Sequence, residues 1–314
     1  VLDRATAAVA KLAPLGDCAD GEALQAVVPP PTDRESRARV DALRAAVAHA
    51  RSLEETGQYA AGLTVAQGAA READHLGYPP LTAEALYRRA SLEEKAGDSE
   101  AAEATLEQAL LAAADARDDE LAAEIWAAQV FIVGERLARP DEALRLRPGA
   151  EAALRRAGGG ADAGADLWES LAGVFHEQAS YEESVRYYRR ALAIREQRQG
   201  LDALEVATTL HNLGVVLLDQ GAYDEARRAD ERALAIWEKA LGPAHPDVAV
   251  ALTNLGNSYA AEGDNDAARP HFERALAIWE KALGPEHLDV ALGLHNLGGV
   301  LAAQGAHDEA RRYF

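Results

Sequence analysis

A 42-residue repeat constrains the fold of this chain more than any other feature of its sequence. The run LHNLG at residues 210–214 returns as LTNLG at 252–256 and again as LHNLG at 294–298. Repeats with periods of this order are typical of units that stack on copies of themselves and bury a shared core. Asn and Gly are poor residues for a helix interior, yet the residues around them favour helix. Their return at the same two positions therefore needs a reason in packing or in binding.

The repeat has the spacing of tetratricopeptide (TPR) helix pairs, with Leu in the usual Trp position. In the clearest unit the pattern comprises Leu252, Leu255, Gly256, Tyr259, Ala268, Phe272 and Ala275. Trp168 fills the Trp position itself two units earlier, and weaker units continue upstream. We predict an all-α fold, a right-handed α-solenoid of TPR helix pairs with six full repeats. A seventh repeat, from Asp289, is cut short.

Three segments are expected along the chain. Residues 1–35 hold an N-terminal helix, Val1–Leu12, and a Pro-rich linker that is stiff and extended. Residues 36–160 hold degenerate TPR repeats and residues 161–314 hold regular ones, and together they form one continuous solenoid. The chain has no Met and stops inside an expected helix. We therefore expect it to be a fragment of a longer protein.

Small and acidic residues at fixed positions indicate how each helix pair packs and where its helices end. Three glycines are expected where the second helix crosses the first, and three more should end the first helix in a left-handed conformation. The two sets are Gly214, Gly256 and Gly298, and Gly221, Gly263 and Gly305. Asp224 and Asp266 are expected to cap second helices, and Asp247 and Asp289 to cap first helices. For the loop residues His245 and His287, solvated or capping roles are favoured over a metal site.

Composition excludes several classes of function. The net charge of -20 argues against binding nucleic acid or an anionic membrane, and no apolar run is long enough to cross a bilayer. The single cysteine, Cys18, fits a reducing compartment such as the cytoplasm. Phosphate-binding loops, zinc-protease motifs and kinase signatures are all missing from the sequence. We expect no catalysis in this chain, no metal and no cofactor.

The recurring asparagine points about 200° away from the glycine that follows it by two residues on the same helix. It should face the concave side of the solenoid, which first helices line. Because an amide both donates and accepts hydrogen bonds, it suits the backbone of an extended peptide. We predict a groove built from Asn212, Asn254, Asn296, Thr208, His211, Val215, Thr253, Asn257 and His295, with a neutral or basic ligand. The alternative is that the asparagines bond to a neighbouring repeat and stabilise stacking, and the two roles can coexist.

The segment from about Leu167 to the end resembles the 42-residue TPRs of kinesin light chains and their bacterial relatives. The resemblance rests on TLHNLG, QGAYDEA and ERALAIWEKALGPAHPDVA. It implies that the groove binds extended peptides and that Asn212, Asn254 and Asn296 contact the peptide backbone. Ser170 departs from the pattern, so the resemblance implies no such contact in that repeat. The heptad segment that binds kinesin is absent.

A second resemblance covers the whole chain less specifically. The segment LAPLGDCADGEALQAVVPPPTDR, followed by degenerate and then regular TPRs, is similar to the C-terminal regions of bacterial serine/threonine protein kinases. Three hypotheses follow. The chain is a protein-protein interaction scaffold; or it is the regulatory, substrate-recruiting part of a kinase whose catalytic domain lies upstream; or it self-assembles through its last repeat.

Overall fold

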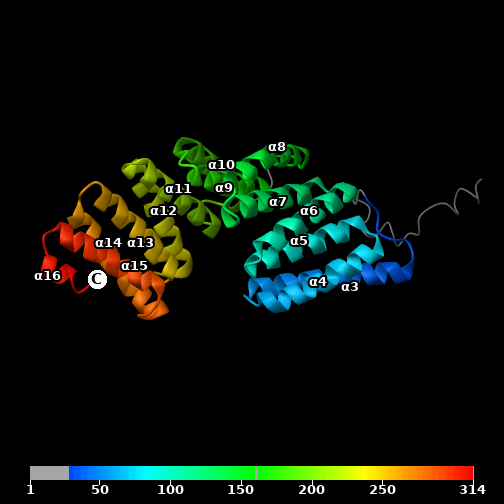
Figure 1. Ribbon diagram of the computed structural model, residues 1–314, viewed down its shortest axis with the longest axis horizontal. Coiled ribbons are helices and arrows are strands. Elements are labelled where there is room, and N and C mark those ends of the chain that lie inside the picture. Colours follow the sequence, from blue (N-terminus) through cyan, green and yellow to red (C-terminus); the bar gives the residue numbers. More distant parts are fainter. Residues whose placement is uncertain (1–27, 160–161, 314) are drawn as a thin grey trace, which may run out of the picture. The chain divides into compact units, whose positions relative to one another are not determined.

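The computed structural model describes residues 28–159 and 162–313, and all regular secondary structure in these ranges is helical (Figure 1). The predicted helix Val1–Leu12 lies outside the described residues. The helices follow one another two to a repeat. The groups are α3 (Arg34–Glu55) with α4 (Tyr59–Leu76), α5 (Pro79–Lys95) with α6 (Ser99–Ala116), α7 (Asp119–Phe131) with α8 (Pro140–Arg156), α9 (Asp162–Glu177) with α10 (Tyr181–Gln199), α11 (Leu204–Gln220) with α12 (Tyr223–Leu241), α13 (Pro246–Ala261) with α14 (Asn265–Leu283), and α15 (Leu288–Ala303) with α16 (His307–Ala310). In every group except that of α7 and α8, the two helices pack against each other.

This arrangement confirms the predicted fold class. The described chain holds six complete pairs and a seventh whose second helix is short, as the repeat register predicts. One feature was not predicted: α7 continues into a short π-helix, η1 (Ile132–Arg136), before α8 begins. None of the helices in the described part of the chain is long and apolar enough to cross a membrane.

The chain divides into two compact units. Among the described residues, the first comprises 28–132 and 151–157, and the second comprises 133–150, 158–159 and 162–313. The predicted division between degenerate and regular repeats falls close by, at residues 160 and 161. Whether the two units continue one solenoid stays a prediction. The recurring asparagines all belong to the second unit.

Glycine lets the two helices of a pair approach closely. A methyl group on Gly256 would lie 2.6 Å from the ring of Phe272, and one on Gly214 would lie 2.7 Å from a carboxylate oxygen of Asp230. Both distances are too short for a real side-chain contact, so only glycine fits. Gly298 is also buried. The predicted packing role of the first two glycines is therefore confirmed.

The left-handed glycines end the first helices as predicted, with φ of +83° at Gly221, +88° at Gly263 and +80° at Gly305. The residue after each glycine donates its backbone N–H back into the first helix, for example from Ala222 to the carbonyl of Leu217 at 2.8 Å. This closure lets the second helix begin at once.

The predicted caps are wrong for this reason. The second helices α12 and α14 have Ala222 and Asp264 at the N-cap, whereas Asp224 and Asp266 lie two residues further on, in the first turn. Of these four residues, only Asp264 caps a helix with its side chain, which accepts a hydrogen bond from the N–H of Ala267 at 3.0 Å.

Histidines cap α13 and α15, the first helices of the two repeats that follow the loops GPAH (242–245) and GPEH (284–287). The Nδ1 of His245 accepts from the N–H of Asp247 at 3.3 Å, and that of His287 accepts from Asp289 at 3.2 Å. The aspartates therefore lie in the first turn, where a negative charge also favours the helix. The expectation that these histidines are solvated or capping residues is confirmed.

Neighbouring second helices are joined by repeated ion pairs. Glu196 on α10 pairs with Arg232 on α12, and Glu238 on α12 pairs with Arg274 on α14, one repeat further along. The partners in both pairs are 36 residues apart. Partly exposed pairs of this kind each contribute at most about 1 kcal/mol, so burial of apolar side chains is the larger stabilising term.

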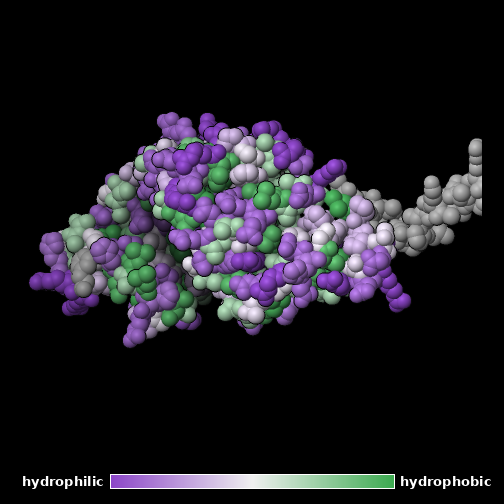
Figure 2. Space-filling view, turned by 45° about the vertical axis from the view of Figure 1, so that its right-hand side comes forward, coloured by the Kyte–Doolittle hydropathy of each residue, from purple (hydrophilic) through white to green (hydrophobic). Residues whose placement is uncertain are grey.

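The core of the second unit lies between the paired helices. Trp168, Trp237 and Trp279 are 5% exposed or less, and alanines fill the closest approaches. On the face shown in Figure 2, hydrophilic residues cover most of the surface and hydrophobic ones form small separate groups.

Candidate functional site

The first helices of the second unit present a narrow accessible face, which we call the stripe. On α11, Thr208 is exposed, and His211, Asn212 and Val215 are half-buried. These residues are spaced three or four apart and so lie on one side of the helix. The residues between them are mostly buried in the pair. On α13 and α15 the stripe continues with Asn254 and Asn257, and with His295 and Asn296.

Thr253 does not belong to the stripe, contrary to prediction. Its side chain is buried, at 5% exposed, and its hydroxyl donates to the carbonyl of Ala249 on its own helix at 2.9 Å. A short branched side chain that bonds back to its own helix stays close to the backbone. A ligand on the stripe would not reach it. Thr208 makes the same type of bond, to Leu204 at 3.2 Å, but remains exposed.

The three asparagines have different surroundings. Asn254 donates from Nδ2 to Nδ1 of His211 at 3.0 Å, and the same nitrogen lies 3.4 Å from a carboxylate oxygen of Asp230. This amide therefore joins α13 to the preceding pair, which is the stacking alternative. Asn212 and Asn296, in contrast, are half-buried and bond to no other residue of the described chain.

Asp230 occupies a position that aromatic rings fill in neighbouring repeats. Tyr188 stands 42 residues before it and Phe272 stands 42 residues after it, and both are buried. Asp230 is 0% exposed, and its Oδ2 has no hydrogen-bond partner in the described chain. Burial raises the pKa of this carboxyl, and the contacts with His211 and Asn254 lower it in part. A polar cluster of His211, Asp230 and Asn254 thus lies below the stripe.

On α9 the stripe is made almost entirely of ionisable residues. Arg195, on α10, is 8% exposed and donates to Asp166 at 2.8 Å and to Glu169 at 2.6 Å. Glu169 also accepts from the hydroxyl of Thr209 on α11. Ser170, the counterpart of the asparagines, is buried and donates to the carbonyl of Asp166 at 2.8 Å. The hydroxyl of Ser170 therefore bonds within its own helix.

Two further groups lie at the end of the α9 stripe. His176 and Asp219 approach to 2.7 Å and join α9 to α11. Glu135, in η1, is exposed overall, but its carboxyl lies against Gly173, where a methyl group would come within 2.2 Å of Oε1. The pKa of Glu135 is raised to about 7, mainly by burial of the carboxyl. The nearby charge of Arg136 opposes this rise, and those of Glu177 and Glu169 add to it. This end of the stripe is therefore acidic and crowded.

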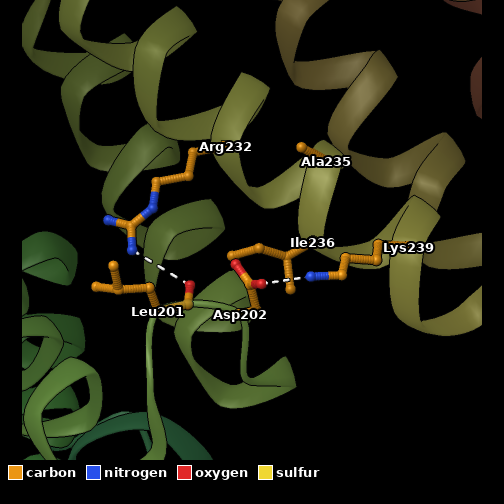
Figure 3. Close-up of a pocket in the computed structure, with 6 residues that line it drawn as sticks. All are labelled: Leu201, Asp202, Arg232, Ala235, Ile236 and Lys239. Carbon is orange, nitrogen blue, oxygen red and sulfur yellow. Dashed lines mark hydrogen bonds and ion pairs between the residues drawn. The ribbon is translucent and has the colours of Figure 1, made fainter.

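A pocket of about 430 Å³ lies away from the stripe, between the α10–α11 loop and α12 (Figure 3). It is lined by Leu201, Asp202, Arg232, Ala235, Ile236 and Lys239. Arg232 donates to the carbonyl of Leu201 at 3.3 Å, and Lys239 donates to Asp202 at 2.5 Å. Both cations already have partners, so the pocket offers an apolar floor and paired charges. Within the described ranges, no group of three or more His, Cys, Asp or Glu side chains is placed to hold a metal ion.

That Asp230 and Glu135 lie next to the stripe was not predicted from the sequence. The signal for Asp230 was present, because it breaks an aromatic pattern at a 42-residue spacing. Glu135 gave no such signal, since the π-helix that places it against α9 interrupts the helical register.

Family models described as tetratricopeptide repeat match residues 47–129, 167–202, 205–278 and 249–314. Among solved structures, BtubC (BKLC) from P. vanneervenii is similar at 28% identity and a TM-score of 0.60, covering 78% of this chain and 94% of that chain. A Rap protein complexed with competence and sporulation factor is similar at 15% identity and a TM-score of 0.58, covering 87% and 74%.

Kinesin-light-chain-like repeats are also among the neighbours. A putative kinesin light chain from Podosopora anserina with nearly identical TPR-like repeats matches at 20% identity, covering 73% of this chain and 89% of that chain. Its TM-score of 0.45 is too low to support an argument about this chain. The comparison with curated proteins finds no significant match.

Proposed function

Because the chain is a tetratricopeptide-repeat protein, we propose that it is a non-catalytic scaffold that binds an extended peptide or partner segment along the stripe. The observation that carries the proposal is the state of Asn212 and Asn296. Both amides are accessible on first helices and lack a partner in the described chain, although each carries two donor hydrogens and an acceptor. A protein of similar fold, Rap, was solved in complex with a factor, which supports a binding role for this fold.

The charge of the stripe favours a neutral or basic ligand. On α9 its exposed or half-buried members include Asp166, Glu169 and Glu177, and the whole chain carries a net charge of -20. An acidic peptide would be repelled during approach and after binding. The ligand should therefore be oriented with its basic residues toward α9.

The kinase-associated hypothesis stays a prediction, as does a cytoplasmic location. None of the family matches or solved structures reported above is a protein kinase. Catalysis is not part of the proposal, and no cofactor is assigned.

The test is a screen of the chain against an array of neutral, basic and acidic peptides, followed by titration of the best binder. Asn212→Ala combined with Asn296→Ala should remove two hydrogen bonds and weaken binding roughly 5- to 150-fold. Helicity should not change, because Ala is the better helix former. Asn265→Ala is the matched control, since Asn265 begins α14 and lies off the stripe. Unchanged affinity in the double variant, or a preference for acidic peptides, would contradict the proposal.

A further inference from the structure

The polar cluster below the stripe determines which ring nitrogen of His211 carries a proton. An amide nitrogen can only donate, and Nδ2 of Asn254 is 3.0 Å from Nδ1 of His211. With the amide in this orientation, Nδ1 accepts the bond. In a neutral imidazole the other nitrogen, Nε2, then carries the hydrogen. The second N–H of the same amide is directed to Asp230, whose Oδ1 lies 3.4 Å away.

Packing fixes the orientation of the ring as well as its tautomer. The imidazole lies beside the indole of Trp237, with centroids 5.7 Å apart and an angle of 52° between the planes. Asp230 is buried below, with Oδ1 3.7 Å from Nδ1. His211 thus contacts two other helices, α12 and α13, and its Nδ1 side is fully occupied.

The Nε2 side remains available on the stripe. The His211 side chain keeps 19% of its surface open to solvent, and Nε2 bonds to no other residue of the described chain. Nε2 is also not among the buried unpaired polar atoms of the described residues. A single N–H donor is therefore held in place on the same face of α11 as the unpartnered amide of Asn212.

We propose that His211 contacts the ligand at the junction of α11 and α13, donating from Nε2 to a backbone carbonyl oxygen of a bound peptide. Asn254 and Asp230 are positioning residues that hold the ring and its tautomer and do not touch the ligand. The proposal rests on the peptide-binding function proposed above. A backbone carbonyl is the expected acceptor, because every residue of a peptide has one and the acidic stripe disfavours a carboxylate.

This inference changes the predicted role of one of the three asparagines. Asn212 and Asn296 would contact the ligand directly, whereas Asn254 would act through His211. The two arrangements differ in a measurable way. If Asn254 acts only through His211, removing both side chains weakens binding no more than removing His211 alone.

The first experiment is a double-mutant cycle on the full chain, with the best peptide from the array as probe. His211→Phe keeps a ring beside Trp237 and removes the donor, and it should weaken binding about 2- to 12-fold. Asn254→Ala should weaken binding by the same factor or less, and the double variant should match His211→Phe within about twofold. His287→Phe is the matched control off the stripe. Circular dichroism confirms that each variant is folded.

The second experiment needs no ligand. In a sample with ¹⁵N-labelled histidine, long-range proton–nitrogen correlation spectra distinguish protonated from unprotonated ring nitrogens, and His211→Phe identifies the signals of His211. Nδ1 should be unprotonated in the wild type, and Asn254→Ala should give a mixture of tautomers.

The outcomes separate the two proposals. A protonated Nδ1 in the neutral wild-type ring, or additive losses in the cycle, would overturn the positioning role of Asn254. No effect of His211→Phe, together with a loss in Asn212→Ala and Asn296→Ala, would overturn the contact by His211 but leave the proposed function intact. If no variant on the stripe alters peptide binding, both the contact and the proposed function fail.

Discussion

Replacing Asp230 with Phe should stabilise the second unit. In the repeat before and the repeat after, the same position holds Tyr188 and Phe272, both buried. The facing residue is the same in both repeats, because Gly214 lies opposite Asp230 as Gly256 lies opposite Phe272. Asp230→Phe therefore restores the packing of the neighbouring pair.

The size of the effect follows from three contributions. Oδ2 of Asp230 is buried without a partner in the described chain, and removing such a group should gain about 1–3 kcal/mol. Burying a phenyl ring adds about 1.5–3 kcal/mol. Losing the contacts of Asp230 with His211 and Asn254 costs about 0.5–1.5 kcal/mol. The free energy of unfolding should rise by about 1–5 kcal/mol.

The gain should also depend on pH. Burial raises the pKa of Asp230 above its ordinary value, so the folded state binds a proton more tightly than the unfolded state. Its contribution to stability is fully present below about pH 4 and is lost as the pH rises through the folded pKa. Phe does not titrate. The advantage of Asp230→Phe over the wild type should therefore widen as the pH rises from about 4 toward neutral.

Urea unfolding monitored by circular dichroism at several pH values measures both quantities, and hydrogen exchange of α11 and α12 amides locates the change. Asp230→Asn is the matched control, because it removes the charge without adding apolar surface. Asp230→Asn should reproduce the part of the advantage over the wild type that depends on pH, but not the part that comes from burying a ring. A neutral-pH midpoint equal to or below that of the wild type, or an advantage that shrinks with rising pH, would refute the reasoning.

Two further predictions concern backbone approach and the acidic end of the stripe. Gly256→Ala should lower the free energy of unfolding by about 1–3 kcal/mol, because its methyl group would overlap a ring of the paired helix. Gly299→Ala should instead raise it by about 0.5–1 kcal/mol, because nothing lies within 4 Å of the added methyl group. Thermal denaturation of the two variants checks both signs. Glu135→Gln should stabilise the protein by up to about 1 kcal/mol above pH 7 and not at pH 4. The pKa of Glu135 is raised from 4.5 to about 7 in the folded state, so the wild type loses stability as the pH rises between these two values. Equal unfolding midpoints for Glu135→Gln and wild type at high pH would contradict this.

The repeat pattern was sufficient to predict the helix pairs, because the close approach of two helices leaves a direct trace in the sequence. Gly256 and Ala268 recur at fixed spacing since nothing larger fits. The turn after each left-handed glycine was predicted too, but its length was not. The residue after Gly263 already donates back into the first helix, so the next helix starts earlier than Asp266 suggested.

The stripe was harder to predict, because helical periodicity gives the direction of a side chain but not its bonding partners. Thr253 lies at the position of His211 and His295 in its repeat, yet its hydroxyl bonds to its own helix and it is buried. Asn254 differs from Asn212 only through its neighbours, since a histidine and a buried carboxylate lie within reach. Such differences arise from packing between repeats, which a single repeat cannot reveal.

The ion pairs between second helices have a consequence for how such a chain can evolve. Glu196 with Arg232 and Glu238 with Arg274 are copies of one pair, and each glutamate meets an arginine of the following unit. If recombination duplicates or deletes one whole unit, every arginine still finds the glutamate of whichever copy precedes it. Array length can therefore change in whole units while this pair is kept between adjacent copies. Asp230 has no such copies, so a duplication that spread its unit would spread a destabilising buried carboxylate with it.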